Sequence, residues 1–220
     1  SIRRIQPDGT TTTVAGTGLP GYKDGPAKQA QFNSPYGIAV DKSGVIYVAD
    51  SLNRRIRKIT PDGTVSTLAG APEQRDGYFL PDVLDGPPTR ARFAFPAGID
   101  VDAEGNVYVA DFDANRIRKV APDGTVTTLA GSGIAGFADG PAREARFNGP
   151  SGVAVDKNGT VYVADFYNHL IRAISPKGDV FTLSGNPEVD EEGNPLGGYE
   201  DGPSETARFD GPASISIGAN

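Results

Sequence analysis

The sequence is short of the side chains on which most enzymes and disulfide-stabilised domains depend. Its 220 residues include no cysteine, no methionine, no tryptophan and one histidine. The lack of cysteine excludes a disulfide framework, a zinc site built on thiolates and a cysteine nucleophile. The single histidine, His169, excludes a zinc site that needs several imidazoles, and no nucleophile-elbow motif surrounds a serine.

The sequence has neither a net positive charge nor a long apolar run. The formal net charge is −7, which argues against nucleic-acid binding along a phosphate backbone. No apolar run approaches the ~18 residues of a transmembrane helix, and no signal peptide is visible, so we expect no membrane insertion. Because the sequence begins with serine and holds no methionine, we interpret it as an excised or processed piece.

Glycine and proline are abundant, with 29 and 18 residues, and they fall in a repeating pattern. The tripeptide Asp-Gly-Pro recurs about every 60 residues, and each copy is followed by a phenylalanine, a proline and an apolar segment. In three copies this is followed by a Tyr-Val-Ala-Asp segment, an Ile-Arg segment and a Pro-x-Gly turn. Such internal repetition is typical of architectures in which each unit packs on its neighbours.

Each repeat contains four short segments with the composition of β-strands. In the third copy these segments are 152–155, 161–164, 170–174 and 180–183, and tight turns at 156–159 and 176–178 separate two of the pairs. They are rich in valine and isoleucine and bounded by Gly, Asp, Asn or Pro. Four antiparallel strands in each repeat predict the blade of a β-propeller.

The segment GVAVDKNGTVYVADFYNHLIRAISPKG, which begins at Gly152, resembles the NHL repeat, as do the segments that begin at Gly37 and Gly98. The resemblance covers the whole chain and implies an all-β propeller of four-stranded antiparallel blades. We expect one NHL-repeat region over residues 1–220, with blade parts at 1–16, 32–70, 93–131, 147–185 and 209–220. Those parts make three complete blades plus split strands of a fourth, and we expect a larger ring or a ring completed by other copies. The long Asp-Gly-Pro connections resemble those of bacterial secreted or surface NHL proteins.

The variable connections predict where ligands bind. In a propeller the connections between blades share one face with the loops between second and third strands, and we call this side the loop-rich face. Aromatic residues gather in these connections and loops, so they are candidate ligand-binding residues, with His169 beside them. The candidates are Tyr22, Tyr78, Phe79, Phe112, Phe137, Phe166, Tyr167, His169 and Tyr199. Alternatively, the aromatic residues near Asp-Gly-Pro hold each connection against its blade.

Other repeated residues have both a structural and a functional interpretation. The phenylalanine after each Asp-Gly-Pro is interpreted as a plug between blades. Asp50, Asp111 and Asp165 end the second strands, where they would either bind Ca²⁺ around a central channel or accept hydrogen bonds from their own loops, assisted by Asn53, Asn115 and Asn168. His169 is interpreted as a variant of the position that holds Arg54 and Arg116.

The leading functional hypothesis is a non-catalytic propeller scaffold that recognises a protein or a glycan through its loop-rich face. One alternative is a metal-dependent enzyme of the lyase or lactonase type with Ca²⁺ in the channel. Another is a structural module that assembles through exposed blade edges, because unpaired strands bind other strands. Apart from that possible Ca²⁺ we expect no cofactor, and we expect an extracellular, cell-surface or periplasmic location.

Overall fold

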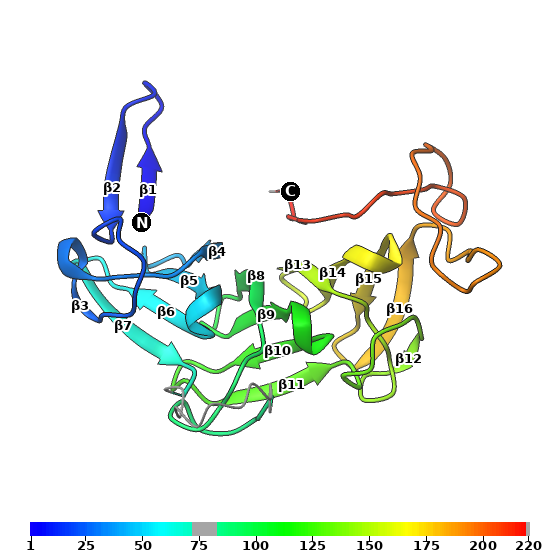
Figure 1. Cartoon of the computed structure of the whole chain (residues 1–220), viewed down its shortest axis with the longest axis horizontal. Helices are drawn as coiled ribbons and strands as arrows, with labels where there is room; N and C mark the ends of the chain where they lie inside the picture. The colour runs from blue at the N-terminus through cyan, green and yellow to red at the C-terminus, as the bar shows by residue number, and fades with distance from the viewer. Residues whose placement is uncertain (72–82, 219–220) are drawn as a thin grey trace.

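The chain is a series of antiparallel sheets that follow one another around an arc (Figure 1). The computed structural model describes residues 1–71 and 83–218. Three sheets are propeller blades, each built from four consecutive strands, and a two-stranded sheet precedes them. This is the predicted β-propeller architecture, with three complete blades and separated strands of a fourth. Within the described residues, no helix is both long enough and apolar enough to cross a membrane.

The three blades have the same order of elements. The first contains β4 (Pro35–Val40), β5 (Ile46–Asp50), η2 (Ser51–Asn53), β6 (Arg55–Ile59) and β7 (Thr64–Ala69). The second contains β8 (Pro96–Val101), β9 (Val107–Asp111), η3 (Phe112–Ala114), β10 (Arg116–Val120) and β11 (Val126–Ala130). The third contains β13 (Pro150–Val155), β14 (Val161–Asp165), η4 (Phe166–Asn168), β15 (Leu170–Ile174) and β16 (Asp179–Ser184). The four segments predicted for this copy therefore fall on β13 to β16.

The middle of each blade is buried on both faces. All five residues of β5 and of β9 are buried, which explains why these strands read as unbroken apolar runs rather than alternating ones. Their side chains pack between blades: the core around Val109 joins the first and second blades, and that around Val163 joins the second and third. In the described residues, each hydrophobic core is shared by two successive sheets, which is the physical reason for repetition.

An aspartate closes the first hairpin turn of every blade. In the third blade, Asp156 Oδ1 accepts the backbone N–H groups of Asn158 and Thr160, each at 2.8 Å, and Oδ2 accepts the Tyr162 hydroxyl at 3.4 Å. The same contacts recur at Asp41 and Asp102. Burial would raise the pKa of Asp156, but these hydrogen bonds outweigh burial and leave the pKa lowered.

Glycine is required where the innermost strands of neighbouring blades approach each other. A Cβ atom on Gly37 would lie 2.2 Å from the Ala97 carbonyl oxygen, and one on Gly98 would lie 2.5 Å from the Ser151 carbonyl oxygen. Gly152 is similarly close to Ser214, with 2.9 Å between its ideal Cβ and the serine Cα. The inner strands therefore pack backbone to backbone around the centre of the arc.

The predicted phenylalanine plugs are buried between blades. Phe32, Phe93 and Phe147 are 4%, 2% and 0% exposed. Each belongs to a core that includes residues of two successive sheets. Phe209, the fourth member of the series, is only partly buried because it follows the last complete blade.

The connections between blades do not stay on the loop-rich face as predicted. Their Asp-Gly-Pro parts run along the outside of the next blade, where β3 (Gly25–Pro26) pairs with β7 and β12 (Gly140–Pro141) pairs with β16. The short helical turn η1 (Ala27–Gln29) follows β3, and the Ala27 N–H donates to the Gly63 carbonyl oxygen in the β6–β7 turn. The outer edge of each blade is thereby covered, which blunts an exposed strand edge.

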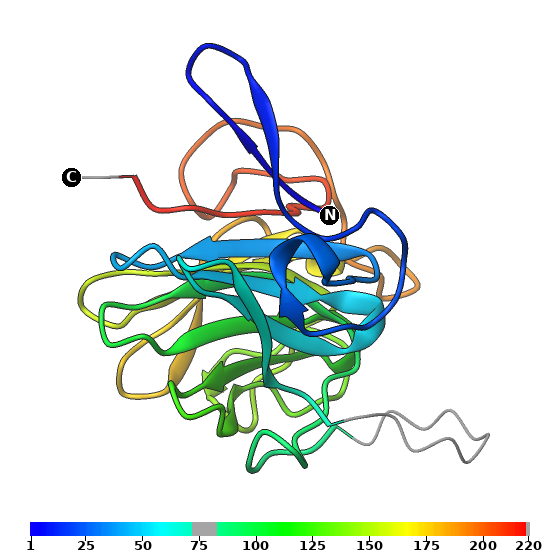
Figure 2. The same cartoon turned by 90° about the vertical axis from the view of Figure 1, so that its left-hand side faces the viewer.

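The parts expected to belong to a fourth blade lie at the two ends of the arc, and in the described part of the chain only the N-terminal one forms strands. Strands β1 (Ile2–Ile5) and β2 (Thr11–Ala15) form a hairpin that projects beyond the blades (Figure 2) and packs on the first blade through Ile2 and Ala15. Residues 212–217, within the blade part expected at 209–220, form no strand. They lie beside β13, but no second strand pairs with them within the described residues.

A buried plug is expected to be far more important for stability than a half-exposed phenylalanine. We predict that Phe147→Ala lowers the free energy of unfolding by about 3–5 kcal/mol, because it removes a fully buried ring and leaves a cavity. Phe181→Ala is the matched control, since Phe181 is 42% exposed on β16, and it should cost much less. Urea unfolding followed by circular dichroism measures both, and equal losses would contradict the plug assignment.

The turn aspartates are expected to make the fold sensitive to acid. Because the folded-state pKa of Asp156 is lowered, its contribution is present above the unfolded-state pKa near 4 and is lost as the pH falls through the folded-state value. Asp156→Asn should therefore lower the urea midpoint at pH 7, and the difference from wild type should shrink toward pH 3. A difference independent of pH would show that ionisation of Asp156 is irrelevant.

Candidate functional site

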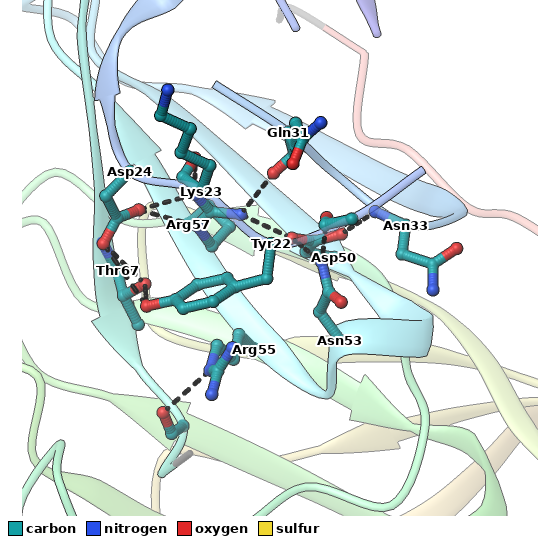
Figure 3. A network of polar contacts seen from close by, with 12 residues as sticks. Tyr22, Lys23, Asp24, Gln31, Asn33, Asp50, Asn53, Arg55, Arg57 and Thr67 are labelled. Carbon is teal, nitrogen blue, oxygen red and sulfur yellow. Dashed lines mark hydrogen bonds and ion pairs between the residues drawn. The ribbon is translucent and has the colours of Figure 1, made fainter. Parts of the chain in front are cut away.

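A fully buried arginine lies at the centre of the first blade (Figure 3). Arg57, on β6, donates from Nη1 to Asp50 Oδ2 at 2.6 Å and from Nη2 to Asp24 Oδ1 at 2.5 Å. It also donates to the carbonyl oxygens of Gln31 and Lys23, each at 3.0 Å. The guanidinium thus joins the end of the second strand to the Asp-Gly-Pro segment, and most of its donors are satisfied.

The same network is built in the other two blades. Arg118 on β10 contacts Asp111 at 3.1 Å and Asp85 at 2.7 Å. Arg172 on β15 contacts Asp165 at 2.8 Å and Asp139 at 2.5 Å. All three arginine side chains and the three strand-ending aspartates are 0% exposed.

The Asp-Gly-Pro aspartates also hold the outermost strands. Asp24 Oδ2 accepts both the N–H and the hydroxyl of Thr67, each at 3.1 Å. Thr128 and Thr182 donate in the same way to Asp85 and Asp139. The repeated tripeptide therefore attaches each connection to its blade through an ion pair and a strand cap.

The candidate metal ligands Asp50, Asp111 and Asp165 lie inside these networks. Asp165 accepts the Asn148 N–H at 2.8 Å, the Asn168 side chain at 2.7 Å and Arg172. Burial raises its pKa to about 6, although Arg172 opposes that shift. Burial likewise raises the pKa of Asp111. The positive charge beside each of these three carboxylates comes from the guanidinium group of an arginine.

The asparagines expected to assist these aspartates do so in two blades. Asn53 and Asn168 donate to Asp50 and Asp165 at 2.8 and 2.7 Å. In the second blade the position three residues after the aspartate is Ala114, and Asn115 instead accepts the Gly149 N–H. No cluster of three or more His, Asp or Glu side chains that could hold a metal ion occurs in the part of the chain that the structure describes.

The aromatic residues before Asp-Gly-Pro differ in their surroundings. The Tyr22 ring lies under the Arg55 guanidinium, with 3.7 Å between Cζ and the ring centroid, and its hydroxyl contacts Thr67 at 2.9 Å. Phe137 lies against Arg172 at 4.8 Å. Tyr199 is 94% exposed. Tyr78 and Phe79 lie outside the described residues.

A second set of aromatic residues crosses the loop-rich face from blade to blade, and we call it the aromatic row. Ring centroids are separated by 6.4 Å from Tyr36 to Phe95, 6.3 Å from Phe95 to Phe112, and 5.6 Å from Phe112 to Tyr167. Phe166 lies 5.0 Å from Tyr167. Most of these contacts are edge to face, a favourable geometry for aromatic pairs.

The sequence predicted only part of this row. It identified Phe112, Phe166 and Tyr167 in the variable turns and missed Tyr36 and Phe95. The available signal was position, since both missed residues flank the proline that opens an innermost strand. The row reaches a central hollow of about 1010 Å³, which Tyr36 helps to line together with the innermost strands.

His169 occupies a left-handed backbone position immediately after η4. Its φ is 57°, and the equivalent residues are Arg54 at 54° and Asn115 at 53°, so the predicted equivalence with Arg116 was wrong by one residue. The imidazole accepts a hydrogen bond at Nδ1 from the Gly211 N–H at 2.9 Å. His169 therefore contacts the segment that follows the third blade.

Comparison with known families finds NHL sequences at all three blades. The NHL repeat model matches residues 93–120 and 147–181, and the teneurin NHL domain model matches residues 21–81. This chain belongs to the NHL-repeat family. NHL repeat-containing protein 2 of Bos taurus is 34% identical over 154 residues, which are 66% of this chain and 21% of that protein. This NHL chain spans about a quarter or less of the length of the curated relatives that it matches.

Solved structures similar to this NHL chain include binding proteins and enzymes. An auxiliary nutrient binding protein from Bacteroides ovatus aligns with a TM-score of 0.62 and 20% identity, covering 84% of this chain and 43% of that one. A virginiamycin B lyase from Staphylococcus aureus aligns with a TM-score of 0.50 and 17% identity, covering 82% and 47%. At such identities the likeness establishes the fold, and function has to be argued from the site.

Comparison of the buried Arg172 with the exposed Arg3 tests the network of buried arginines and aspartates directly. We predict that Arg172→Ala lowers the free energy of unfolding by about 3–5 kcal/mol, because it leaves Asp165 buried without its counter-ion. Arg3 is the equivalent residue of the N-terminal hairpin, because it pairs with Thr13 as Arg57 pairs with Thr67. Arg3 is exposed, so Arg3→Ala should change the free energy of unfolding by less than about 0.5 kcal/mol. Chemical unfolding of both variants measures this, and similar losses would refute the role of the buried pair.

Proposed function

We propose that this NHL chain is a non-catalytic recognition scaffold that binds a protein partner through its loop-rich face. The observation that carries the proposal is the aromatic row. It crosses three blades on a rigid framework, and its end residues Tyr36 and Tyr167 are 64% and 50% exposed. Tyrosines fixed on a rigid scaffold are frequent anchors of protein interfaces.

The geometry of the row favours a protein over a glycan. A sugar stacks on an open aromatic face, whereas the edge-to-face contacts from Tyr36 to Phe95 and from Phe95 to Phe112 cover part of each ring. The exposed edges and hydroxyl groups suit apolar side chains and backbone groups of a partner. The equivalent turn of the first blade adds one exposed aliphatic side chain to the same face, since Leu52 of η2 is 52% exposed.

The arrangement of the ionisable groups supports binding rather than bond-making. Catalysis by Asp50, Asp111 or Asp165 would need a carboxylate open to substrate, and each is fully buried against an arginine. His169 uses Nδ1 to accept a backbone N–H. The predicted extracellular or surface location, bacterial source and self-association are compatible with this scaffold and stay predictions.

Removal of the exposed ends of the row should weaken partner binding. We predict that the double variant Tyr36→Ala, Tyr167→Ala binds peptides of an immobilised peptide array roughly tenfold or more weakly than wild type, because each aromatic anchor contributes on the order of 1–2 kcal/mol. Tyr199→Ala is the control, since Tyr199 is 94% exposed and lies outside the row, and it should bind as wild type does.

Two outcomes would count against the proposal. Binding to a glycan array with none to the peptide array would replace the protein partner with a sugar. Peptide binding that survives the double variant would move the interface away from the row. Elemental analysis tests the enzyme alternative separately, because a stoichiometric metal in the purified chain would favour metal-dependent chemistry.

A further inference from the structure

The only histidine of the chain holds the segment that follows the third blade. His169 Nδ1 lies 2.9 Å from the Gly211 nitrogen, whose N–H donates to it. The Phe166 ring packs on the same glycine, where a Cβ would lie 3.0 Å from ring carbons. Two side chains from the η4 turn therefore fix the backbone at the entry to residues 212–217, which pack beside β13.

The same attachment exists one blade earlier, with a different acceptor. Asn115 Oδ1 accepts the Gly149 N–H at 2.9 Å, and the Phe112 ring packs 3.0 Å from the ideal Cβ position of that glycine. Asn115 and His169 have nearly the same left-handed backbone conformation. The two attachments are equivalent in geometry, but only the imidazole can take up a proton between about pH 5 and pH 8.

An imidazole nitrogen can accept the Gly211 N–H only while that nitrogen carries no proton. The neutral ring must therefore hold its proton on Nε2. When Nδ1 takes a proton from solvent, two N–H groups face each other and the hydrogen bond to Gly211 is lost. A partner for the new N–H is the carboxylate of Asp210, whose Oδ1 lies 3.5 Å from Nδ1.

We propose that His169 is a proton-controlled attachment between the third blade and the segment that follows it. Neutral His169 holds Gly211, and protonated His169 releases Gly211 and pairs with the Asp210 carboxylate. Because Phe166 belongs to the aromatic row and also packs on Gly211, protonation changes the end of the loop-rich face. The attachment itself does not depend on the proposed binding function.

The charged surroundings of the imidazole are simple within the described residues. The neighbouring residues of η4 and β15 are Phe166, Tyr167, Asn168 and Leu170, and none of them carries a formal charge. From the long connection the imidazole meets Gly197, whose ideal Cβ would lie 2.8 Å from the ring. The carboxylate that faces the ring is that of Asp210. In the same connection, Arg208 pairs with Glu188 and Glu200.

Nuclear magnetic resonance of the ¹⁵N-labelled 220-residue chain tests the proposal, because its spectrum contains one imidazole. At pH 8 we expect an unprotonated Nδ1 and a protonated Nε2. On titration to pH 5, the Gly211 amide proton should shift toward the value of an amide without this hydrogen bond, with the same midpoint as His169. The Gly149 amide, bonded to Asn115, should not follow that titration.

Two variants separate proton control from a merely structural role. His169→Asn places the Asn115 side chain type in the equivalent position, so the Gly211 amide should stay hydrogen bonded from pH 8 to pH 5. Asp210→Asn removes the partner of the protonated ring, so the proton affinity of His169 should fall roughly two- to fivefold.

Specific results would overturn the proposal. A neutral imidazole with its proton on Nδ1 would be incompatible with it, and so would a Gly211 amide that follows pH equally in wild type and His169→Asn. Should His169→Asn fail to fold, an Asp210→Asn variant with unchanged proton affinity and unchanged Gly211 titration would refute the exchange of partners.

Discussion

The constraint on which the rest of the structure depends is the charge buried inside each blade. A guanidinium in the interior is tolerated only when counter-ions and hydrogen-bond acceptors surround it. For Arg57 one carboxylate comes from the second strand and the other from the connection that precedes the blade, 33 residues earlier in the chain. A four-stranded sheet alone is therefore not the structural unit. The unit is the sheet together with its Asp-Gly-Pro connection, and this explains why the two recur together.

The ends of the arc show what happens to the same residues when the unit is incomplete. Ile38 on the first blade is 51% exposed, whereas its equivalents Ile99 and Val153, each facing a complete preceding blade, are 7% and 4% exposed. Tyr199 is likewise almost fully exposed, while its equivalent Tyr22 stacks on Arg55. Residue type and local conformation do not decide burial here. The neighbouring blade does, as expected for an architecture whose interfaces form its core.

Because burial depends on the neighbouring blade, the sequence predicts local features well and contacts between distant segments poorly. Strands, turns and the plug residue Phe147 were predictable, because their signals are local and recur in register. The Arg57 network was not, since an arginine between isoleucine and lysine reads as an exposed strand residue. Its partner Asp24 is distant in sequence, and only the fold brings them together. The aromatic row from Tyr36 to Tyr167 was predicted only in part. Its contacts join residues of different blades, and no repeating sequence pattern indicates which aromatic residues of neighbouring blades meet.

The left-handed residue after each second-to-third-strand turn shows where a repeated scaffold allows variation. A non-glycine residue in this conformation costs on the order of 1 kcal/mol, yet Arg54, Asn115 and His169 all adopt it. The turn requires the same backbone conformation in every blade, whereas the type of side chain at this position differs from blade to blade. Two of the three choices supply an acceptor for the next entry glycine, and only the imidazole can be switched off by a proton. Variation at one constrained position thus gives otherwise equivalent junctions different chemical properties.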